Sequence, residues 1–500
     1  MKLSSLTFDL SAHQPIPTLE ITNLTENSKL ASSSSLFVCI AGAVADGHSY
    51  ARAAYENGCR AFVAQKKLDL PIDATVFYVE DTRRTLATLA CRFYGHPTKR
   101  MRVIGITGTK GKTTTARLIA QILNRSSIPC GYIGTNGILY GNKRMDTKNT
   151  TPDAVTLQRT FSEMLRDGIQ TAVLEVSSQA LKQFRADGIE FDTVLFTNLF
   201  PDHIGDGEHR DMEEYKSCKK RLFTEFPFRR FISWADDPFA AELNKGIEKD
   251  KCFLCSALDE RADFYIQSIR PERFENGLGV SFDLCRNETR SPVSLPLLGK
   301  INAQNAALAL AVATERFAID LSVASESLKQ AAVTGRSETI LLPSGAFVCL
   351  DYAHNGASLQ QLLTSLAEYH PSRLTVLFGS VGERTQMRRA EMGRVAALYA
   401  DRAILTSDNP GKEDPEAIIA DIAVGFSGTD TPFVSIPDRK EAIRYALEHT
   451  AHGEILVLAG KGHEAYQLIG TQKLPFSERE IVEAFITAQK EKPQNTLLKT

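Results

Sequence analysis

An apolar strand, a glycine-rich loop and an amphipathic helix follow one another between Val103 and Leu123. The strand from Val103 to Ile106 runs into Thr107-Gly108-Thr109-Lys110-Gly111-Lys112-Thr113-Thr114, and the helix from Ala116 to Leu123 comes next. Glycines let backbone N–H groups turn toward a phosphate, and the positive end of the helix dipole favours the same anion. This order predicts an α/β sheet of the buried parallel type with a phosphate-binding loop.

The loop departs from the spacing G-x-x-x-x-G-K-[ST], because Ile106 stands where the first glycine belongs. Lys112 can still reach the β and γ oxygens of a nucleotide, and Thr113 can ligate Mg²⁺. The alternative is a glycine-rich turn with an exposed lysine. The order of strand, loop and helix favours a nucleotide site with seven contact residues: Gly108, Thr109, Lys110, Gly111, Lys112, Thr113 and Thr114.

The length of 500 residues is too great for one hydrophobic core and suggests about three domains. We expect a small N-terminal α/β domain over residues 1–98, a central P-loop domain with a parallel sheet over 99–336, and a C-terminal doubly wound, Rossmann-like domain over 337–500. Each has short apolar strands that alternate with helical patterns. The last dozen residues are expected to fray.

Charge and cysteine distribution exclude several classes of protein. A formal net charge of −2 leaves no electrostatic footprint for a nucleic acid or an anionic membrane. Neither a signal peptide nor an apolar run of roughly 18 residues is found, so we expect a cytoplasmic protein. The nine cysteines lie mostly in apolar segments, which favours reduced core thiols. For the lone pair Cys252 and Cys255, a zinc or redox role is the alternative to a core position.

A series of segments, in one order over nearly the whole chain, resembles the Mur ligase family. The loop TGTKGKTT is similar to the TGT-x-GKT loop of these enzymes and of the related folylpolyglutamate synthetases. The DNP motif with its E-D-P, and GKGHE-x-Y-Q, resemble the MurE branch, which extends UDP-N-acetylmuramoyl-L-alanyl-D-glutamate. The remaining segments are DGHSY at Asp46, NTTPD at Asn149, EVSSQAL at Glu175, FTNLFPDHI at Phe196, EYKSCKKRLF at Glu214, GKINAQNA at Gly299, TGRSE at Thr334 and LDYAHN at Leu350.

The resemblance implies an ATP-dependent ligase of peptidoglycan synthesis that activates a carboxylate as an acyl phosphate. Three anionic groups meet in such a reaction, so metal ions and lysines must offset their repulsion. Glu175, at the end of an apolar strand, is expected to ligate Mg²⁺ beside Thr113. By resemblance, His203 is a second-metal ligand, and Lys219 is carbamylated by CO₂ and bridges the metals. From the residues alone, Lys219 would belong to a solvated helix face. The expected catalytic set is Lys112, Glu175, His203 and Lys219.

Substrate contacts are implied residue by residue. For the muramoyl-dipeptide they are Thr150, Thr151, Ser177, Gln183 and Arg185, and a guanidinium suits a carboxylate. For the uridine they are Ser28 and the turn Asp46-Gly47-His48, with ordinary turn chemistry as the alternative. For the nucleotide the further contacts are Asn302, Asn305, Arg336 and Asp351.

The incoming amino acid is expected in a third-domain pocket formed by Arg384, Asp408, Asn409, Gly411, Gly460 and Glu464. Gly411 bears on which amino acid is added, because family members that add meso-diaminopimelate typically carry an arginine there, which binds the second carboxylate of that substrate. Glycine supplies no cation, so L-lysine is favoured, with Glu413 or Asp414 near its ammonium. Diaminopimelate and ornithine stay open, because the missing charge could come from Lys412, Arg388 or Arg389.

Two other classes compete with this interpretation. A folylpolyglutamate synthetase shares the loop and the carbamylated lysine, but here a UDP-binding domain precedes the loop. A non-catalytic nucleotide-binding paralogue would not need the catalytic residues as a set. We expect a monomeric enzyme that uses UDP-N-acetylmuramoyl-L-alanyl-D-glutamate, a free amino acid, ATP and Mg²⁺.

Overall fold

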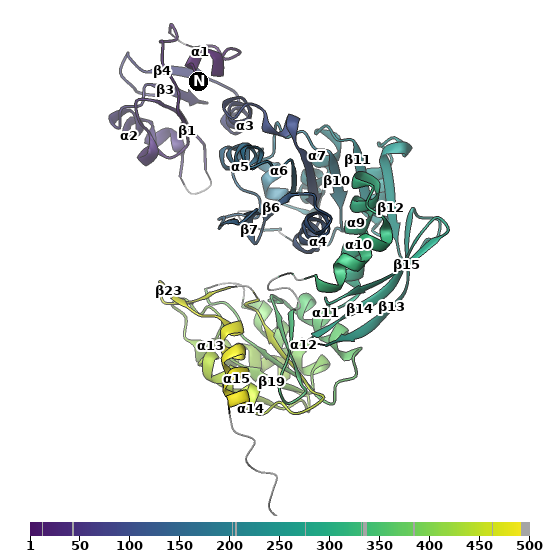
Figure 1. The fold of residues 1–500 in the computed structure, drawn as a ribbon. Coiled ribbons are helices and arrows are strands. Elements are labelled where there is room, and N and C mark those ends of the chain that lie inside the picture. The colour runs from purple at the N-terminus through teal and green to yellow at the C-terminus, as the bar shows by residue number, and fades with distance from the viewer. Residues whose placement is uncertain are drawn as a thin grey trace, which may run out of the picture. The chain divides into compact units, whose positions relative to one another are not determined.

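The computed structural model describes residues 1–12, 14–42, 45–202, 204–205, 208–275, 277–331, 333, 338–383, 386–462 and 464–491. The chain divides into two compact units (Figure 1). The first consists of Met1–Tyr265 and Ala307–Ala324, and the second of Ile266–Ala306 and Ser325–Thr500. Both are α/β structures, as the sequence predicts.

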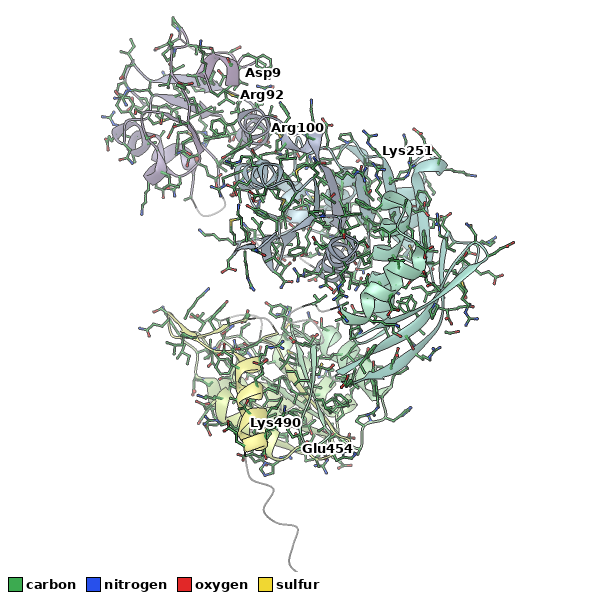
Figure 2. All side chains as sticks on the ribbon, viewed as in Figure 1. Asp9, Arg92, Arg100, Lys251, Glu454 and Lys490 are labelled. Carbon is green, nitrogen blue, oxygen red and sulfur yellow. The ribbon has the colours of Figure 1, made fainter. Side chains whose placement is uncertain are left out.

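A four-stranded parallel sheet in the order β1-β2-β3-β4 forms the N-terminal part of the first unit. The elements are α1 (Leu3–Leu6), β1 (Asn23–Thr25), η1 (Ser28–Leu30), β2 (Ser35–Val38), η2 (Gly47–Tyr50), α2 (Ala51–Glu56), β3 (Ala61–Ala64), β4 (Thr75–Tyr78), α3 (Thr82–Phe93) and η3 (Pro97–Arg100). Asp81 caps α3 by accepting hydrogen bonds from the amides of Arg83 and Arg84. Near the end of α3, Arg92 pairs with Asp9 (Figure 2).

The rest of the first unit is a larger sheet in the order β12-β11-β10-β5-β9-β6-β7-β8. Strands β12 to β6 of this order are parallel, and β7 and β8 add an antiparallel edge. The elements are β5 (Arg102–Thr107), α4 (Lys112–Arg125), β6 (Cys130–Gly134), β7 (Gly137–Tyr140), β8 (Lys143–Met145), α5 (Ala154–Arg166), β9 (Thr171–Glu175), α6 (Ser178–Lys182), β10 (Thr193–Phe196), α7 (Met212–Thr224), β11 (Arg230–Trp234), α8 (Pro238–Asn244), η4 (Lys249–Lys251) and β12 (Cys252–Ser256). Because β5 lies between β10 and β9, the carboxyl ends of these three strands meet at one edge.

The second unit contains a six-stranded sheet in the order β16-β17-β21-β18-β19-β20, parallel except for β16. This crossover order is the doubly wound arrangement that the sequence predicts. The elements are β14 (Gly277–Arg286), β15 (Thr289–Leu295), η5 (Leu328–Gln330), β16 (Glu338–Leu341), β17 (Phe347–Asp351), α11 (Gly356–Ala367), β18 (Leu374–Phe378), α12 (Met387–Tyr399), β19 (Arg402–Leu405), α13 (Pro415–Ala423), η6 (Val424–Phe426), β20 (Phe433–Ser435), α14 (Arg439–Glu448), β21 (Ile455–Ala459), β22 (Tyr466–Ile469), β23 (Gln472–Pro475) and α15 (Glu478–Glu491).

Three further elements lie at the division between the units. They are β13 (Phe264–Phe274), which begins beside β12, and α9 (Lys300–Phe317) and α10 (Leu321–Ser327). The strands β13, β14 and β15 are not predicted from the sequence, although Asn276-Gly277 between β13 and β14 is a hairpin-turn motif that could have indicated them. Of the residues predicted to fray, 489–491 belong to the last turn of α15, and residues 492–500 lie outside the described part.

The cysteines occupy the positions expected of core thiols, and all nine are free. Cys255 is buried, while Cys252 is partly buried against the core of the first unit. Residues three apart on a strand point to opposite faces of the sheet, so the two thiols cannot both ligate one metal ion on the same face. No helix in the described part of the chain is both long and apolar enough to cross a membrane.

Candidate active site

The glycine-rich loop joins β5 to α4 at the carboxyl edge of the large sheet. Gly108 and Gly111 adopt φ angles of 151° and 85°, a region that favours glycine. A Cβ atom on Gly108 would lie 1.9 Å from Thr197 Oγ1, so the close approach of β10 also requires glycine there. Gly111 directly precedes the first turn of α4, and the N-terminal end of a helix is suited to a phosphate.

Two residues that follow β10 hold this loop in shape. Asn198 Oδ1 accepts a hydrogen bond from the Lys110 amide at 2.8 Å, and the Asn198 carbonyl accepts one from the Thr109 amide at 2.9 Å. Thr197 Oγ1 donates to the Lys110 carbonyl at 2.7 Å. The sequence analysis assigns no role to this pair, although residues at the carboxyl end of a strand beside the loop strand are natural candidates.

Glu175 ends β9 and is fully buried. Its Oε1 accepts hydrogen bonds from the Tyr132 hydroxyl at 2.5 Å and the Thr135 amide at 3.0 Å. Its Oε2 accepts from the hydroxyls of Thr113 at 2.9 Å and Thr135 at 3.2 Å. A Cβ atom on Gly134 would come within 2.1 Å of Oε1, so the carboxylate needs a glycine beside it. The expected proximity of Glu175 and Thr113 is therefore present.

This pair fits a magnesium ion by its chemistry. Carboxylate and hydroxyl oxygens are the ligands that Mg²⁺ prefers. Burial, and then the charge of Glu175, raise the pKa of Tyr132 far above its usual range, so Tyr132 stays a hydrogen-bond donor that fixes Oε1. The hydroxyl protons on Thr113 and Thr135 can rotate away from Oε2, which leaves that oxygen as the natural metal ligand.

Lys219, on α7, is only 1% exposed, so the solvated helix face suggested by the residues alone is wrong for it. Its Nζ donates to the Gly108 carbonyl at 2.8 Å and lies 4.4 Å from the centre of the Tyr215 ring. Lys112 Nζ donates to the same carbonyl at 2.8 Å. Burial, and then the charge of Lys112, lower the pKa of Lys219 well below its usual range, against the smaller opposing effect of Asp202.

Three of the four expected catalytic side chains, Lys112, Glu175 and Lys219, therefore meet around one loop. The fourth, His203, lies outside the described residues. Within the described part of the chain, no group of three or more His, Cys, Asp and Glu residues could hold a metal ion. The oxygen pair of Thr113 and Glu175 is thus the part of the expected metal site that can be examined.

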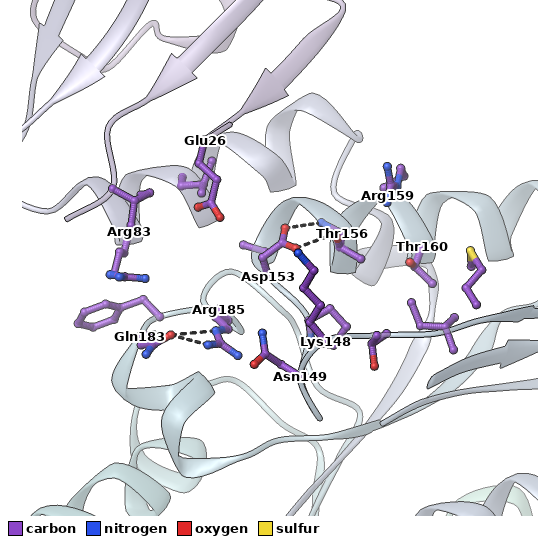
Figure 3. Close-up of a pocket in the computed structure, with 18 of the residues that line it drawn as sticks. Glu26, Arg83, Lys148, Asn149, Asp153, Thr156, Arg159, Thr160, Gln183 and Arg185 are labelled. Carbon is purple, nitrogen blue, oxygen red and sulfur yellow. Dashed lines mark hydrogen bonds between the residues drawn. The ribbon is translucent and has the colours of Figure 1, made fainter. Parts of the chain in front are cut away.

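A cavity of about 470 Å³ in the first unit is lined by residues expected to bind the muramoyl-dipeptide (Figure 3). Gln183 and Arg185 line it, and Arg185 Nε donates to Gln183 Oε1 at 3.1 Å. Arg185 Nη1 donates to the Thr151 carbonyl at 2.9 Å, and Thr151 Oγ1 donates to the Glu175 carbonyl at 2.8 Å. Ser177 joins this chain through its amide, which donates to Thr151 Oγ1 at 3.0 Å. The cavity is therefore linked by hydrogen bonds to the end of β9.

Basic and acidic side chains both line this cavity. Burial, and then the charge of Arg83, lower the pKa of Arg185, while the carboxylates of Asp153 and Glu26 act in the opposite direction. An anion beside the two guanidinium groups would offset their mutual repulsion. Thr150 links the same region to Thr113 and Glu175, the residues that fit a magnesium ion, because its Oγ1 lies 3.2 Å from Thr135 Oγ1. Basic lining residues that the sequence analysis does not single out are Arg83, Lys148 and Arg159.

The turn Asp46-Gly47-His48 shows ordinary turn chemistry. Asp46 Oδ1 accepts hydrogen bonds from the His48 amide at 3.0 Å and from His48 Nδ1 at 2.6 Å. The Gln65 amide donates to His48 Nε2 at 3.0 Å, so the ring carries its proton on Nδ1. A Cβ atom on Gly47 would lie 2.6 Å from the backbone of Ile40. Neither this turn nor Ser28, in η1, lines the cavity, and their uridine role stays a prediction.

In the second unit, the fully buried Lys461 organises the residues expected to bind the amino acid. Its Nζ donates to Asn409 Oδ1 and to the Tyr466 carbonyl, each at 2.9 Å, and lies 3.2 Å from Asp408 Oδ1. It also contacts Glu464 Oε2 at 3.3 Å, while Asn409 Nδ2 donates to that oxygen at 3.0 Å. The sequence analysis misses this lysine, although its place inside GKGHE was a usable signal.

Gly411 and Gly460 have φ angles of 60° and 113°, which favour glycine. A Cβ atom on Gly411 would lie 2.8 Å from Glu383 Oε2, the far end of a flexible side chain. A Cβ atom on Gly460 would lie 2.9 Å from Asp408 Oδ2. An arginine at position 411 therefore has room if Glu383 moves, but its backbone is strained.

The two carboxylates proposed for a lysine substrate already have structural partners. Glu413 Oε1 and Oε2 accept from Arg389 Nη1 and Nη2 at 2.6 and 2.7 Å, which lowers the pKa of Glu413 to about 2. Asp414 caps α13 by accepting from the Glu416 amide at 3.0 Å. Arg389 also donates to Asp421, so it is neutralised as well. Glu413 and Arg389 are thus engaged with each other, which leaves neither of them free for the incoming amino acid, and Asp414 uses one oxygen as a helix cap.

The other residues expected to contact the nucleotide belong to the second unit. Asn302 and Asn305 are buried on α9, where Asn305 Nδ2 donates to Asn302 Oδ1 at 3.0 Å. Asp351 ends β17 and accepts from the Ala353 amide at 2.8 Å. Asn355, which has no role assigned from the sequence, caps α11. Two expected contacts, Arg336 and Arg384, lie outside the described residues.

Comparison with known proteins gives matches along nearly the whole chain. Residues 20–94 match the catalytic domain of the Mur ligase family, residues 106–313 the Mur ligase middle domain and residues 335–462 the Mur ligase glutamate ligase domain. The chain is 36% identical over 477 residues to the UDP-N-acetylmuramoyl-L-alanyl-D-glutamate--2,6-diaminopimelate ligase of Caldanaerobacter subterraneus subsp. tengcongensis, covering 95% of this chain and 96% of that protein.

Two further similarities agree with this match. An enzyme of the same name from Bacillus licheniformis is 37% identical over 478 residues, covering 93% of this chain and 95% of that protein. A solved structure of a UDP-N-acetylmuramoyl-L-alanyl-D-glutamate--2,6-diaminopimelate ligase aligns with a TM-score of 0.73 and 29% identity. That alignment covers 98% of this chain and 99% of the solved one.

Proposed function

The chain belongs to the Mur ligase family of ATP-dependent, ADP-forming amino-acid ligases, and we propose that it adds the third residue to UDP-N-acetylmuramoyl-L-alanyl-D-glutamate. One observation carries this proposal. Lys112 and Lys219 both donate to the Gly108 carbonyl, and Thr113 donates to Glu175, so the groups needed to activate a carboxylate surround one loop. We also propose that residues 1–98, 99–336 and 337–500 serve the UDP substrate, ATP and the amino acid, respectively.

The proposed reaction has two steps. A carboxylate oxygen of the UDP substrate attacks the γ-phosphorus of ATP, ADP leaves, and an acyl phosphate forms. The amino group of the incoming residue then attacks the acyl carbon, the carbon–oxygen bond to phosphate breaks, and nitrogen loses a proton. Bound Mg²⁺ offsets the repulsion between the anionic groups.

The chain's own residues position and neutralise these groups. The loop amides and the first turn of α4 face the phosphates, and Lys112 adds a positive charge. Thr113 and Glu175 are the proposed magnesium ligands. Gln183 and Arg185 are proposed to orient the muramoyl-dipeptide in the cavity, from which Thr151 leads to the end of β9.

We further propose that Lys219 carries a carbamate formed from CO₂. The neutral amine nitrogen forms a bond to the CO₂ carbon and releases one proton, so an uncharged group becomes an anion beside the loop. Three observations support this proposal: the resemblance to the family, the complete burial of Lys219, and its contact with a loop carbonyl. His203 is proposed as a metal ligand on the resemblance alone.

For the added amino acid we propose meso-diaminopimelate, in place of the L-lysine that the sequence analysis favours. The relatives at 36–37% identity are named as ligases of 2,6-diaminopimelate. Glu413, one of the two carboxylates suggested for a lysine ammonium, is already paired with Arg389. Lys412 is exposed beside Gly411 and is the side chain we propose to meet the second carboxylate. Lysine and ornithine remain the competing substrates.

An amino-acid panel tests these proposals. Phosphate release by the full-length protein would be measured with ATP, Mg²⁺, UDP-N-acetylmuramoyl-L-alanyl-D-glutamate and one amino acid at a time. We expect release that requires the UDP substrate and is fastest with meso-diaminopimelate. Faster release with lysine or ornithine would overturn the choice of amino acid only. No release with any of the three would favour the non-catalytic paralogue.

A further inference from the structure

The Phe184 ring contacts two guanidinium groups, and its neighbours in the chain are two residues of the substrate cavity. The centre of its ring is 4.7 Å from Arg84 Cζ and 4.7 Å from Arg221 Cζ. Its neighbours Gln183 and Arg185 line the cavity, as Phe184 itself does (Figure 3). Neither arginine has a role in the proposed chemistry, so their placement on this ring needs its own explanation.

The backbone at Phe184 is unusual for such a residue. Its φ angle is 57°, a left-handed conformation that a bulky side chain rarely adopts. The turn is closed by hydrogen bonds from the Phe184 amide to the Leu181 carbonyl at 3.2 Å and from the Arg185 amide to the Ala180 carbonyl at 2.9 Å. Glycine or asparagine would occupy this conformation at lower cost. The aromatic ring must therefore contribute something that the turn alone does not require.

The two arginines come from different elements and share their carboxylate partners. Arg84 belongs to α3 and lies 3.5 Å from Asp187 Oδ2 and 3.6 Å from Glu225 Oε2. Arg221 belongs to α7, two residues after Lys219, and lies 3.6 Å from Asp187 Oδ1 and 2.8 Å from Glu225 Oε2. We call Phe184 with Arg84, Arg221, Asp187 and Glu225 the Phe184 clamp.

The clamp acts on the same turn that presents the cavity residues. Arg221 Nη1 donates to the Leu181 carbonyl, so α7 contacts both the backbone of the turn and the Phe184 ring. The orientation of Arg185 depends on Gln183 Oε1 and on the Thr151 carbonyl, which accept its hydrogen bonds. If the turn relaxed out of its left-handed conformation, the direction in which Gln183 and Arg185 leave the backbone would change.

We propose that Phe184 is a positioning residue for the UDP substrate, because the clamp fixes the directions of Gln183 and Arg185. This inference rests on the proposed function. It makes α3 and α7, which hold the two guanidinium groups, part of the apparatus that orients the muramoyl-dipeptide. The ring itself takes no part in proton or phosphoryl transfer.

The test is steady-state kinetics on full-length Phe184→Ala, with each substrate varied in turn. We expect the KM for the UDP substrate to rise about tenfold, because a tenfold change corresponds to losing one modest interaction. The KM values for ATP and the amino acid, and kcat, should stay within about twofold. Isothermal titration of the UDP substrate without ATP should show the same loss of affinity. The conservative variant Phe184→Tyr keeps an aromatic ring beside both guanidinium groups, and its KM for the UDP substrate should equal that of the wild type.

Two further variants separate positioning from general damage. Phe8 is 72% exposed and lies 4.4 Å from Arg92 Cζ, so Phe8→Ala removes the same kind of contact away from the cavity and should change no KM. Arg84→Met removes one face of the clamp from a side chain that is 56% exposed, and should raise the KM for the UDP substrate about threefold without unfolding the protein.

The outcomes distinguish this inference from the proposed function. An unchanged KM for the UDP substrate in an active Phe184→Ala enzyme overturns the clamp and leaves the function standing. An equal loss toward all three substrates overturns it too, since that indicates a merely structural role. If wild-type protein neither binds the UDP substrate nor releases phosphate with it, the proposed function and the clamp fall together.

Discussion

Each unit of the molecule contains a fully buried lysine, and the two lysines have opposite surroundings. Lys219 has a backbone carbonyl, an aromatic face and the cation of Lys112 as near neighbours. Lys461 has two carboxylates, Asp408 and Glu464, within 3.3 Å of its ammonium. A buried charge that is paired serves structure, whereas a buried amine that its surroundings discharge is available for chemistry.

The carboxylates of Asp187 and Glu413 show the same contrast between burial and charge pairing. Burial raises the pKa of Asp187 to about 6, despite the nearby Arg221 and Arg84. For Glu413, the hydrogen bonds from Arg389 lower the pKa to about 2. The identity of an ionisable residue therefore says little about its role until burial and pairing are both known. Four substitutions would sharpen or break this comparison.

Replacement of Lys219 should have the largest effect. We expect Lys219→Ala to lower kcat by on the order of 10³ or more, because an essential electrostatic group is lost beside the phosphates. Phosphate release measures this, and thermal unfolding should show a fold that is still intact. Small carboxylates or bicarbonate should restore part of the activity. Normal turnover in the variant would remove Lys219 from the mechanism.

Lys461→Met should mainly reduce stability. Loss of the ammonium leaves Asp408 buried, and Glu464 partly buried, without their cation, which costs about 3–5 kcal/mol of unfolding free energy. Urea unfolding measures this loss. The matched variant Lys219→Met should lose much less, because burial already disfavours the charge it removes. Equal losses in the two variants would break the comparison between the lysines.

Asp187→Asn should change how stability depends on pH. The folded pKa, about 6, lies above the unfolded value of 3.8, so the protonated form is favoured by folding. The stability it contributes is complete below pH 3.8 and is lost as the pH rises through 6, a change of about 1–3 kcal/mol. Relative to wild type, the variant should gain stability between pH 4.5 and 7.5 in urea unfolding. A parallel pH dependence in both proteins would mean that the arginines, and not burial, dominate.

Gly411→Arg should have the smallest effect. The new cation is expected to shift the ratio of kcat/KM for diaminopimelate over lysine about tenfold, the usual worth of one charge-assisted contact. The strained backbone should cost about 1 kcal/mol of stability. The amino-acid panel on both proteins measures the shift. An unchanged preference would point to another selector, for which Lys412→Met is the next variant to assay.

Local features of the fold could be predicted because short stretches of sequence determine them. The strand predicted from Val103 to Ile106 lies within β5, since an uninterrupted apolar run must be buried. The loop between β5 and α4 follows from its glycines and its place between strand and helix. The strands β13 and β15 escaped prediction because they carry charged residues on an exposed face, and β14 escaped it although eight of its ten residues are buried.

The residues of the site fall into two groups: those that the local sequence predicts and those that only packing reveals. By itself, the sequence determined the family, the phosphate loop and the residues at strand ends, because local pattern and motif order carry that information. Only the tertiary structure decided that Lys219, 111 residues from Gly108, is buried against the loop, that Glu413 and Asp414 are already engaged, and that Lys461 organises the second unit. Burial and charge pairing depend on contacts between distant segments, and those contacts exist only once the chain has packed.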